Sequence, residues 1–117
     1  MSQIVLDTVV GRLQIKDRWL DVGDELYLLS PREFDLMKYL MLHPNQVCAR
    51  KEIVDEAWGG AVTEANVTYH VKQLRDQIKQ GSRLIRTVPN SGYIILTDTQ
   101  RETAFNKGLN LLEGSEE

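Results

Sequence analysis

One stretch of the chain restricts the fold more than any other, because it can form only a helix with a single apolar face. In residues 63–80 four apolar side chains recur at intervals of four, three and four: Val67, Val71, Leu74 and Ile78. At 100° per residue they fall within an arc of about 60°, so this helix buries one side only. Its other side must face solvent or a ligand, and the residues there decide the functional interpretation.

The side of this helix opposite the apolar arc is polar. His70 and Arg75 lie on its flanks, and the far side carries Ala65, Thr68, Tyr69, Lys72, Gln73, Asp76 and Lys79. Lysine, arginine, glutamine, threonine and tyrosine are side chains that reach base edges and phosphates in a major groove. This composition favours DNA recognition, and an ordinary solvated helix face is the alternative.

The first thirty residues predict a small sheet. Short apolar stretches such as Ile4-Val5-Leu6 and Leu26-Tyr27-Leu28-Leu29 alternate with turn residues that include Gly11 and Gly23. Such alternation is typical of antiparallel strands joined by tight turns, and we expect three or four of them.

A helix is predicted to follow this sheet. Ser30-Pro31-Arg32-Glu33 combines Ser at the N-cap, Pro at N1 and Glu at N3, which together form a capping box, and His43-Pro44 ends the helix. Helical spacing predicts that its buried side comprises Phe34, Leu36, Met37, Tyr39, Leu40 and Met41.

A second, shorter helix is expected from about Arg50 to Trp58, before Gly59-Gly60. Its inward residues are expected to be Ile53, Val54, Ala57 and Trp58. Ala49 occupies its N-cap without a capping side chain, at a cost of about 1 kcal/mol in local stability.

Residues 83–96 contain two apolar runs on either side of Pro89-Asn90-Ser91-Gly92, a turn-rich tetrad that predicts a β-hairpin. A sheet, two helices, a longer one-faced helix and a hairpin follow one another in the order of a winged helix-turn-helix, an α+β fold. We expect this domain to span residues 1–96, with the wing at about 84–96. Residues 97–117 read as a polar, acidic tail or linker.

The net charge of −3 at first argues against a nucleic-acid ligand. Divided along the chain, however, the net charge is −3 for residues 1–63, +3 for residues 64–93 and −3 for residues 94–117. The positive charge is therefore concentrated on the one-faced helix and the hairpin. Because few basic side chains are available for phosphate contacts, one copy should bind weakly, and a weak dimer or cooperative binding between copies is expected.

The sequence offers little for other chemistries. A chain of 117 residues fits one domain, and it contains no Gly-rich phosphate loop, nucleophile elbow or paired-carboxylate motif. His43 and His70 lack the partners and spacing of a metal site. Cys48 is the single cysteine, for which a packing role is favoured over a catalytic one. We expect a protein that is not an enzyme and uses no cofactor.

The location expected from the sequence is the cytoplasm. A lone cysteine fits a reducing compartment. The first ten residues lack the basic and apolar regions of a signal peptide, and no apolar run reaches the length of a membrane span.

Four ordered motifs between Leu26 and Leu96 carry a resemblance to a known family. They are Leu29-Ser30-Pro31-Arg32-Glu33-Phe34-Asp35-Leu36-Met37, Arg50-Lys51-Glu52-Ile53-Val54 with Trp58, Val67-Thr68-Tyr69-His70-Val71-Lys72-Gln73-Leu74-Arg75, and Ile85-Arg86-Thr87-Val88-Pro89-Asn90-Ser91-Gly92-Tyr93. The chain resembles the DNA-binding domains of the OmpR/PhoB type, and especially the N-terminal cytoplasmic domain of ToxR- and CadC-like transcriptional activators.

The resemblance implies a recognition helix in the major groove and a wing near an adjacent minor groove. By position, His70, Lys72, Gln73 and Arg75 match the family's DNA-contacting stretch, and Thr87 and Asn90 lie in its wing. With Thr68, Tyr69 and Lys79 from the exposed helix side and Arg86 from the hairpin, these residues are the candidate DNA contacts. Trp58 matches an aromatic residue that can touch RNA polymerase in relatives, and a core position is the alternative; Tyr93 is expected in the core.

The sequence also departs from the family at several of these positions. Gln73 and Asp76 stand where many relatives have basic residues, and the wing tip lacks the frequent Arg or Lys. We therefore keep two hypotheses: sequence-specific binding of double-stranded DNA in transcription regulation, and a winged-helix module for protein–protein contact with weak or lost DNA binding.

Two arrangements of the regulator are compatible with the chain. Because the fold begins almost at Met1, we expect no preceding receiver domain, which leaves a stand-alone regulator or the cytoplasmic part of a membrane-anchored, ToxR-like activator. In the second arrangement, which we favour, residues 97–117 are a juxtamembrane linker and a membrane segment follows residue 117.

Overall fold

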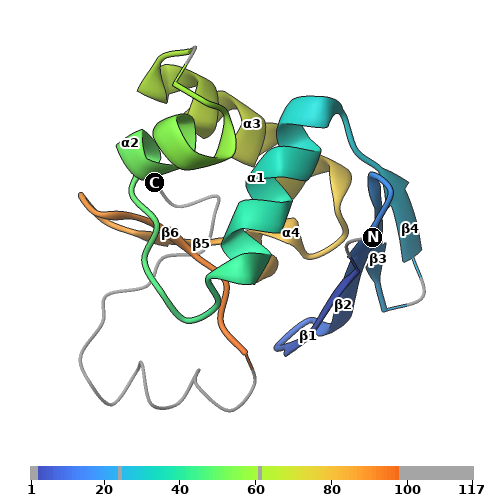
Figure 1. The fold of residues 1–117 in the computed structure, drawn as a ribbon. Coiled ribbons are helices and arrows are strands. Elements are labelled where there is room, and N and C mark those ends of the chain that lie inside the picture. Colours follow the sequence, from blue (N-terminus) through green and yellow to red (C-terminus); the bar gives the residue numbers. More distant parts are fainter. Residues whose placement is uncertain (1–2, 24, 61, 98–117) are drawn as a thin grey trace.

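A four-stranded antiparallel sheet forms the N-terminal part of the computed structural model, which describes residues 3–23, 25–60 and 62–97 (Figure 1). Its strands, in the spatial order in which they occur in the chain, are β1 (Ile4–Thr8), β2 (Gly11–Lys16), β3 (Trp19–Val22) and β4 (Glu25–Leu28). Strict alternation directs Leu13 and Ile15 of β2 and Leu20 and Val22 of β3 into the core. The sequence predicted three or four strands, and the sheet has four.

Helix α1 (Pro31–Leu42) begins as the sequence predicts. The Ser30 hydroxyl accepts a hydrogen bond from the Glu33 backbone N–H at 3.3 Å, which is one half of the predicted capping box. The Glu33 carboxylate, expected to return to the N-cap, faces His70 of a later helix. The buried residues of α1 are Leu36, Met37, Leu40 and Met41, whereas Phe34 and Tyr39 are only half-buried at the edges of the stripe.

The second helix consists of α2 (Arg50–Glu52) followed directly by a π-helical turn, η1 (Ile53–Ala57). Ile53 and Val54 are buried as expected, and Ala57 is half-buried against the core. Glu52 partly replaces the missing cap, because its carboxylate accepts a hydrogen bond from the Ala49 backbone N–H at 3.3 Å.

Helix α3 (Glu64–Gln77) is shorter than the predicted range of 63–80. Ile78 adopts an extended conformation, and Gln80 has a left-handed φ of 62° before a single turn, α4 (Gly81–Leu84). Gly81 lies against the α3 backbone so closely that a Cβ would approach the Arg75 Cα to 2.6 Å. Ile78 nevertheless stays buried, so apolar periodicity alone could not reveal that the helix ends before it.

The C-terminal hairpin, hereafter the wing, consists of β5 (Arg86–Val88) and β6 (Gly92–Ile94) (Figure 1). It starts later than the predicted residue 84, because Leu84 belongs to α4. Two backbone hydrogen bonds attach it to the segment before α2: Cys48 donates to the Tyr93 carbonyl at 2.8 Å, and Tyr93 donates to the Cys48 carbonyl at 3.0 Å.

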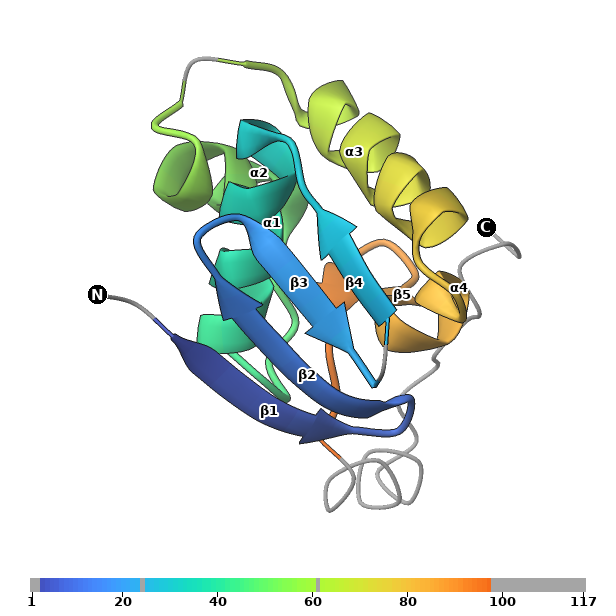
Figure 2. The same ribbon diagram turned by 90° about the vertical axis from the view of Figure 1, so that its right-hand side faces the viewer.

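The sheet covers one side of the helices, and α3 runs beside β4 (Figure 2). The Tyr27 hydroxyl accepts a hydrogen bond from the Lys79 backbone N–H at 3.0 Å, and Gln77 donates to the Leu28 carbonyl at 3.3 Å. These contacts fix the end of α3 against the sheet. At the C-terminal side, Thr97 still belongs to the folded unit, since its N–H donates to the Asn45 side chain at 3.0 Å. The rest of the predicted tail, residues 98–117, lies outside the described residues.

None of the helices in the described ranges has the length and apolar character needed to cross a bilayer.

Candidate nucleic-acid interface

Helix α3 presents the two different faces that the sequence predicts. Val67, Val71 and Leu74 are fully buried against the core, while Ala65, Tyr69, Lys72 and Asp76 are exposed, as is Lys79 just beyond the end of the helix. Tyr69 is 57% exposed, an unusual degree for an aromatic side chain on a helix in contact with the core. The side chains on the face opposite the core are therefore largely open to solvent.

The charges on this exposed face are available to an external ligand. Lys72 Nζ lies 3.0 Å from Asp76 Oδ2, but their side chains are 71% and 63% exposed. An exposed pair at this spacing contributes little to stability, and its lysine can exchange the carboxylate for a phosphate at small cost.

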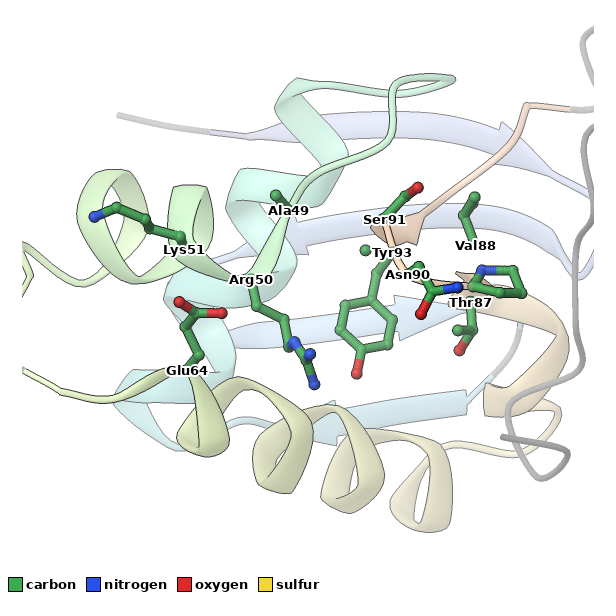
Figure 3. Close-up of a pocket in the computed structure, with 11 residues that line it drawn as sticks. Ala49, Arg50, Lys51, Glu64, Thr87, Val88, Asn90, Ser91 and Tyr93 are labelled. Atoms are coloured by element: carbon green, nitrogen blue, oxygen red, sulfur yellow. The ribbon is translucent and has the colours of Figure 1, made fainter.

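A polar groove separates the start of α2 from the wing, next to the first turn of α3 (Figure 3). It has a volume of about 450 Å³ and is lined by Ala49, Arg50, Lys51, Glu64 and residues 87–93. The exposed Arg50 donates a hydrogen bond to the Thr68 hydroxyl at 3.0 Å, and so joins α2 to α3 beside its exposed face. Lys51, beside it, pairs with Asp55 at 2.9 Å.

Arg50 is the residue that the sequence analysis missed as a part of this surface. The sequence did contain an indication. The helix dipole disfavours a basic pair such as Arg50-Lys51 at the start of a helix, so this pair is better explained by contact with a ligand than by helix stability. Only the fold, however, places the start of α2 beside α3.

His70 does not lie on the exposed face. Its Nδ1 is 3.3 Å from Glu33 Oε2 of α1, and the two side chains are only 16% and 13% exposed. Its ring also meets the indole of Trp58 edge-on, with centroids 5.6 Å apart. The helix flank on which the sequence placed His70 is turned towards α1, so this side chain packs α3 against α1.

Arg75 is likewise turned towards the protein. Its Nε and one terminal nitrogen donate to the Ile85 carbonyl at 3.1 and 2.8 Å, and the same terminal nitrogen donates to the Thr87 hydroxyl at 2.8 Å. Thr87 is only 8% exposed. The structure thus places Arg75 and Thr87 together, in a contact between α3 and the wing and away from the exposed surface.

The remaining candidates vary in exposure. Gln73 and Arg86 are half-buried, and Asn90 is exposed at the tip of the wing with a left-handed φ of 62°. In Figure 3, Asn90 and Ser91 lie on the wing side of the groove, across from Arg50. The structure therefore brings the wing tip and the start of α2 to the two sides of one groove.

Trp58 takes the core position that was the alternative in the sequence analysis. It is 7% exposed, and its indole N–H donates to the Arg32 carbonyl at 3.0 Å. The indole therefore has little surface left for contact with another molecule.

Cys48 and Tyr93 are both buried in the core. Burial, reinforced by the nearby Glu52 carboxylate, raises the pKa of the Cys48 thiol to about 11. The thiol is therefore protonated at neutral pH, which makes it a poor nucleophile. Within residues 3–23, 25–60 and 62–97 no three His, Cys, Asp or Glu side chains are grouped so that they could hold a metal ion.

Comparison with known proteins matches residues 23–95 to the family described as transcriptional regulatory protein, C terminal. The phosphate regulon transcriptional regulatory protein PhoB of Escherichia coli is 32% identical over 75 residues, which cover 61% of this chain and 33% of PhoB. The chain thus corresponds to about a third of that relative's length.

Two solved structures show the same fold. The DNA-binding domain of E. coli CadC is 26% identical, with a TM-score of 0.64, and the match covers 82% of this chain and 94% of that one. The DNA-binding domain of Klebsiella pneumoniae RstA, solved in complex with the RstA box, is 23% identical with a TM-score of 0.64, covering 79% and 96% of the two chains. The predicted winged-helix fold with its N-terminal antiparallel sheet is confirmed. The short helix α4 was not predicted from the sequence.

Proposed function

We propose that this chain, which belongs to the family of C-terminal domains of transcriptional regulatory proteins, binds double-stranded DNA sequence-specifically and thereby regulates transcription. In this proposal α3 lies in the major groove and the wing near the adjacent minor groove. The observation that carries the proposal is the exposed polar face of α3, with Tyr69 and Lys72 directed away from a core that the other face fills.

The proposed contacts form two groups. The first group comprises Thr68, Tyr69, Lys72 and Gln73 of α3 and Lys79 just beyond its end, which include donors suited to base edges and to phosphates. At the groove they are Arg50 and Asn90, to which we add Arg86 at the start of β5. His70, Arg75 and Thr87, which the sequence analysis included, support these elements from within the protein.

Cooperation between copies is part of the proposal. On the exposed face of α3 the charge of Asp76 cancels that of Lys72, so one copy can neutralise few phosphates. Two copies on half-sites one helical turn apart would add their contacts. A duplex with two half-sites should therefore bind with a steeper concentration dependence than a duplex with one. We place this activity in the cytoplasm, where DNA and RNA polymerase would meet the domain.

Titration of promoter duplexes at several salt concentrations tests the proposal. Counterion release predicts that log K falls linearly with log salt concentration, and that Lys72→Ala reduces the slope by about one unit. Lys16→Ala is the matched control, because Lys16 is an exposed lysine on the N-terminal sheet and its loss should leave the slope unchanged.

A protein–protein contact is the second candidate function, and an exposed apolar patch favours it. Trp19 and Leu28 are direct cross-strand partners on the outer face of the sheet and are 47% and 49% exposed. Leu26, on the same strand and face as Leu28, is 65% exposed. Absence of salt-dependent DNA binding at low ionic strength would favour this alternative over the first.

A further inference from the structure

The side chain of Arg75 connects the recognition helix to both strands of the wing. Its guanidinium donates to the Ile85 carbonyl, which directly precedes β5, and to the Thr87 hydroxyl within β5, at distances between 2.8 and 3.1 Å. The same group lies 5.4 Å from the ring centroid of Tyr93 in β6, a cation–π distance.

These contacts are directed and need the shape of an arginine. A guanidinium is planar and its N–H groups point outward in that plane, so one edge can donate to two acceptors while its flat face lies over the ring of Tyr93. A lysine at this position keeps the charge but is a point donor, and it cannot reproduce the fork.

The wing has a second anchor on another element. The backbone pairing between Cys48 and Tyr93 holds β6 to the segment before α2. Arg75 is therefore placed to set the distance between α3 and the wing, and with it the spacing of the two elements that would enter neighbouring grooves.

We propose that Arg75 is a positioning residue, which holds the wing at a fixed distance from α3 so that both can contact one DNA duplex together. The effect on DNA binding rests on the proposed function. The contact that holds the wing is a property of the free protein and does not depend on DNA. A direct DNA contact by Arg75, the role expected from the sequence, is the competing account.

The first experiment uses the free protein and measures amide hydrogen exchange. In Arg75→Lys the amides of β5 and β6 should exchange about tenfold faster or more, because the hydrogen bonds that hold the wing are lost, while α1 amides keep their rates. Lys72→Ala, which removes a charge from the exposed side of the same helix, should leave the wing unchanged. Wild-type exchange rates of the wing in Arg75→Lys would overturn the proposal.

A second variant keeps the proposal testable if Arg75→Lys does not fold. Thr87→Val removes one acceptor of the guanidinium and leaves the charge of Arg75 in place. It should accelerate exchange in the wing in the same direction and to a smaller extent. If Thr87→Val leaves the exchange of the wing unchanged, Arg75 does not hold the wing through this hydroxyl and the proposal fails.

The second experiment measures the consequence for DNA with a probe at the wing tip. Asn90→Asp adds a negative charge at a residue whose left-handed backbone aspartate also tolerates, and it should weaken duplex binding about threefold if the wing lies near phosphates. In an Arg75→Lys background Asn90→Asp should weaken binding little or not at all, whereas in a Lys72→Ala background it should still weaken binding about threefold.

The outcomes separate the two proposals. An equal Asn90→Asp penalty in all three backgrounds would overturn the positioning role of Arg75 and leave DNA binding standing. If the wild-type chain shows no salt-dependent binding, the proposed function fails, and the exchange experiment alone decides whether Arg75 holds the wing.

Discussion

Gly92, the first residue of β6, offers the sharpest perturbation of the described fold. Its Cα lies so close to the segment before α2 that a Cβ would be 2.1 Å from the Cys48 carbonyl oxygen and 2.9 Å from the Ala49 Cα. Its φ of 146° is in addition a value that residues with a side chain rarely adopt. Gly92→Ala should therefore displace the wing from its anchor.

The magnitude follows from what the displacement breaks. Relief of the clash requires the backbones to separate by roughly 1 Å, which is enough to disrupt the two hydrogen bonds between Cys48 and Tyr93. Each such bond contributes about 1 kcal/mol net, and the backbone conformation costs a further ~1–3 kcal/mol. The free energy of unfolding should thus fall by about 3–5 kcal/mol.

Urea denaturation of wild type, Gly92→Ala and Gly59→Ala provides the assay. Gly59 also has a positive φ, of 73°, but a Cβ there meets nothing within 4 Å, so Gly59→Ala isolates the conformational cost at about 1–2 kcal/mol. If the two substitutions lower the free energy of unfolding equally, the close approach of the wing to Cys48 is refuted.

Two further predictions concern the core. Leu74→Ala should lower the free energy of unfolding by about 3–5 kcal/mol in the same denaturation assay, because Leu74 is fully buried on α3, and a loss below about 1 kcal/mol would contradict the burial of this face. The pKa of the Cys48 thiol is raised from 9.0 to about 11 in the folded protein, so the unfolded chain loses its proton first and stability falls as the pH rises from 9 to 11. Between pH 8 and pH 10.5 wild type should lose up to about 2 kcal/mol more than Cys48→Ala, and equal losses would show that the thiol is not buried.

The sequence predicted those parts of the fold whose signals are local. The short apolar stretches and turns of the N-terminal sheet, the Ser30 cap and the apolar arc of α3 each concern residues a few positions apart, and all three are present in the structure. The end of α3 was wrong by about three residues, because Ile78 stays buried in an extended conformation that periodicity cannot distinguish from helix.

The candidate site was less predictable, because its flanks depend on contacts across the fold. His70 and Arg75 lie at the borders of the apolar arc, where helical phase alone does not decide between solvent and protein. Their partners Glu33 and Ile85 lie 37 and 10 residues away in the chain, and only the packing of α3 shows that both side chains turn inward. Arg50 was missed for the same reason, since its place beside Thr68 results from the packing of α2 on α3.

The central claim is that the exposed face of α3 and the wing tip together form the DNA-binding surface. An NMR titration of the labelled protein with a promoter duplex tests this claim most directly, because every amide reports separately. We predict that the largest shift changes fall on Thr68, Tyr69, Lys72 and Asn90, with little change on the sheet. Changes concentrated around Trp19 and Leu26 instead, or none at low salt, would contradict it.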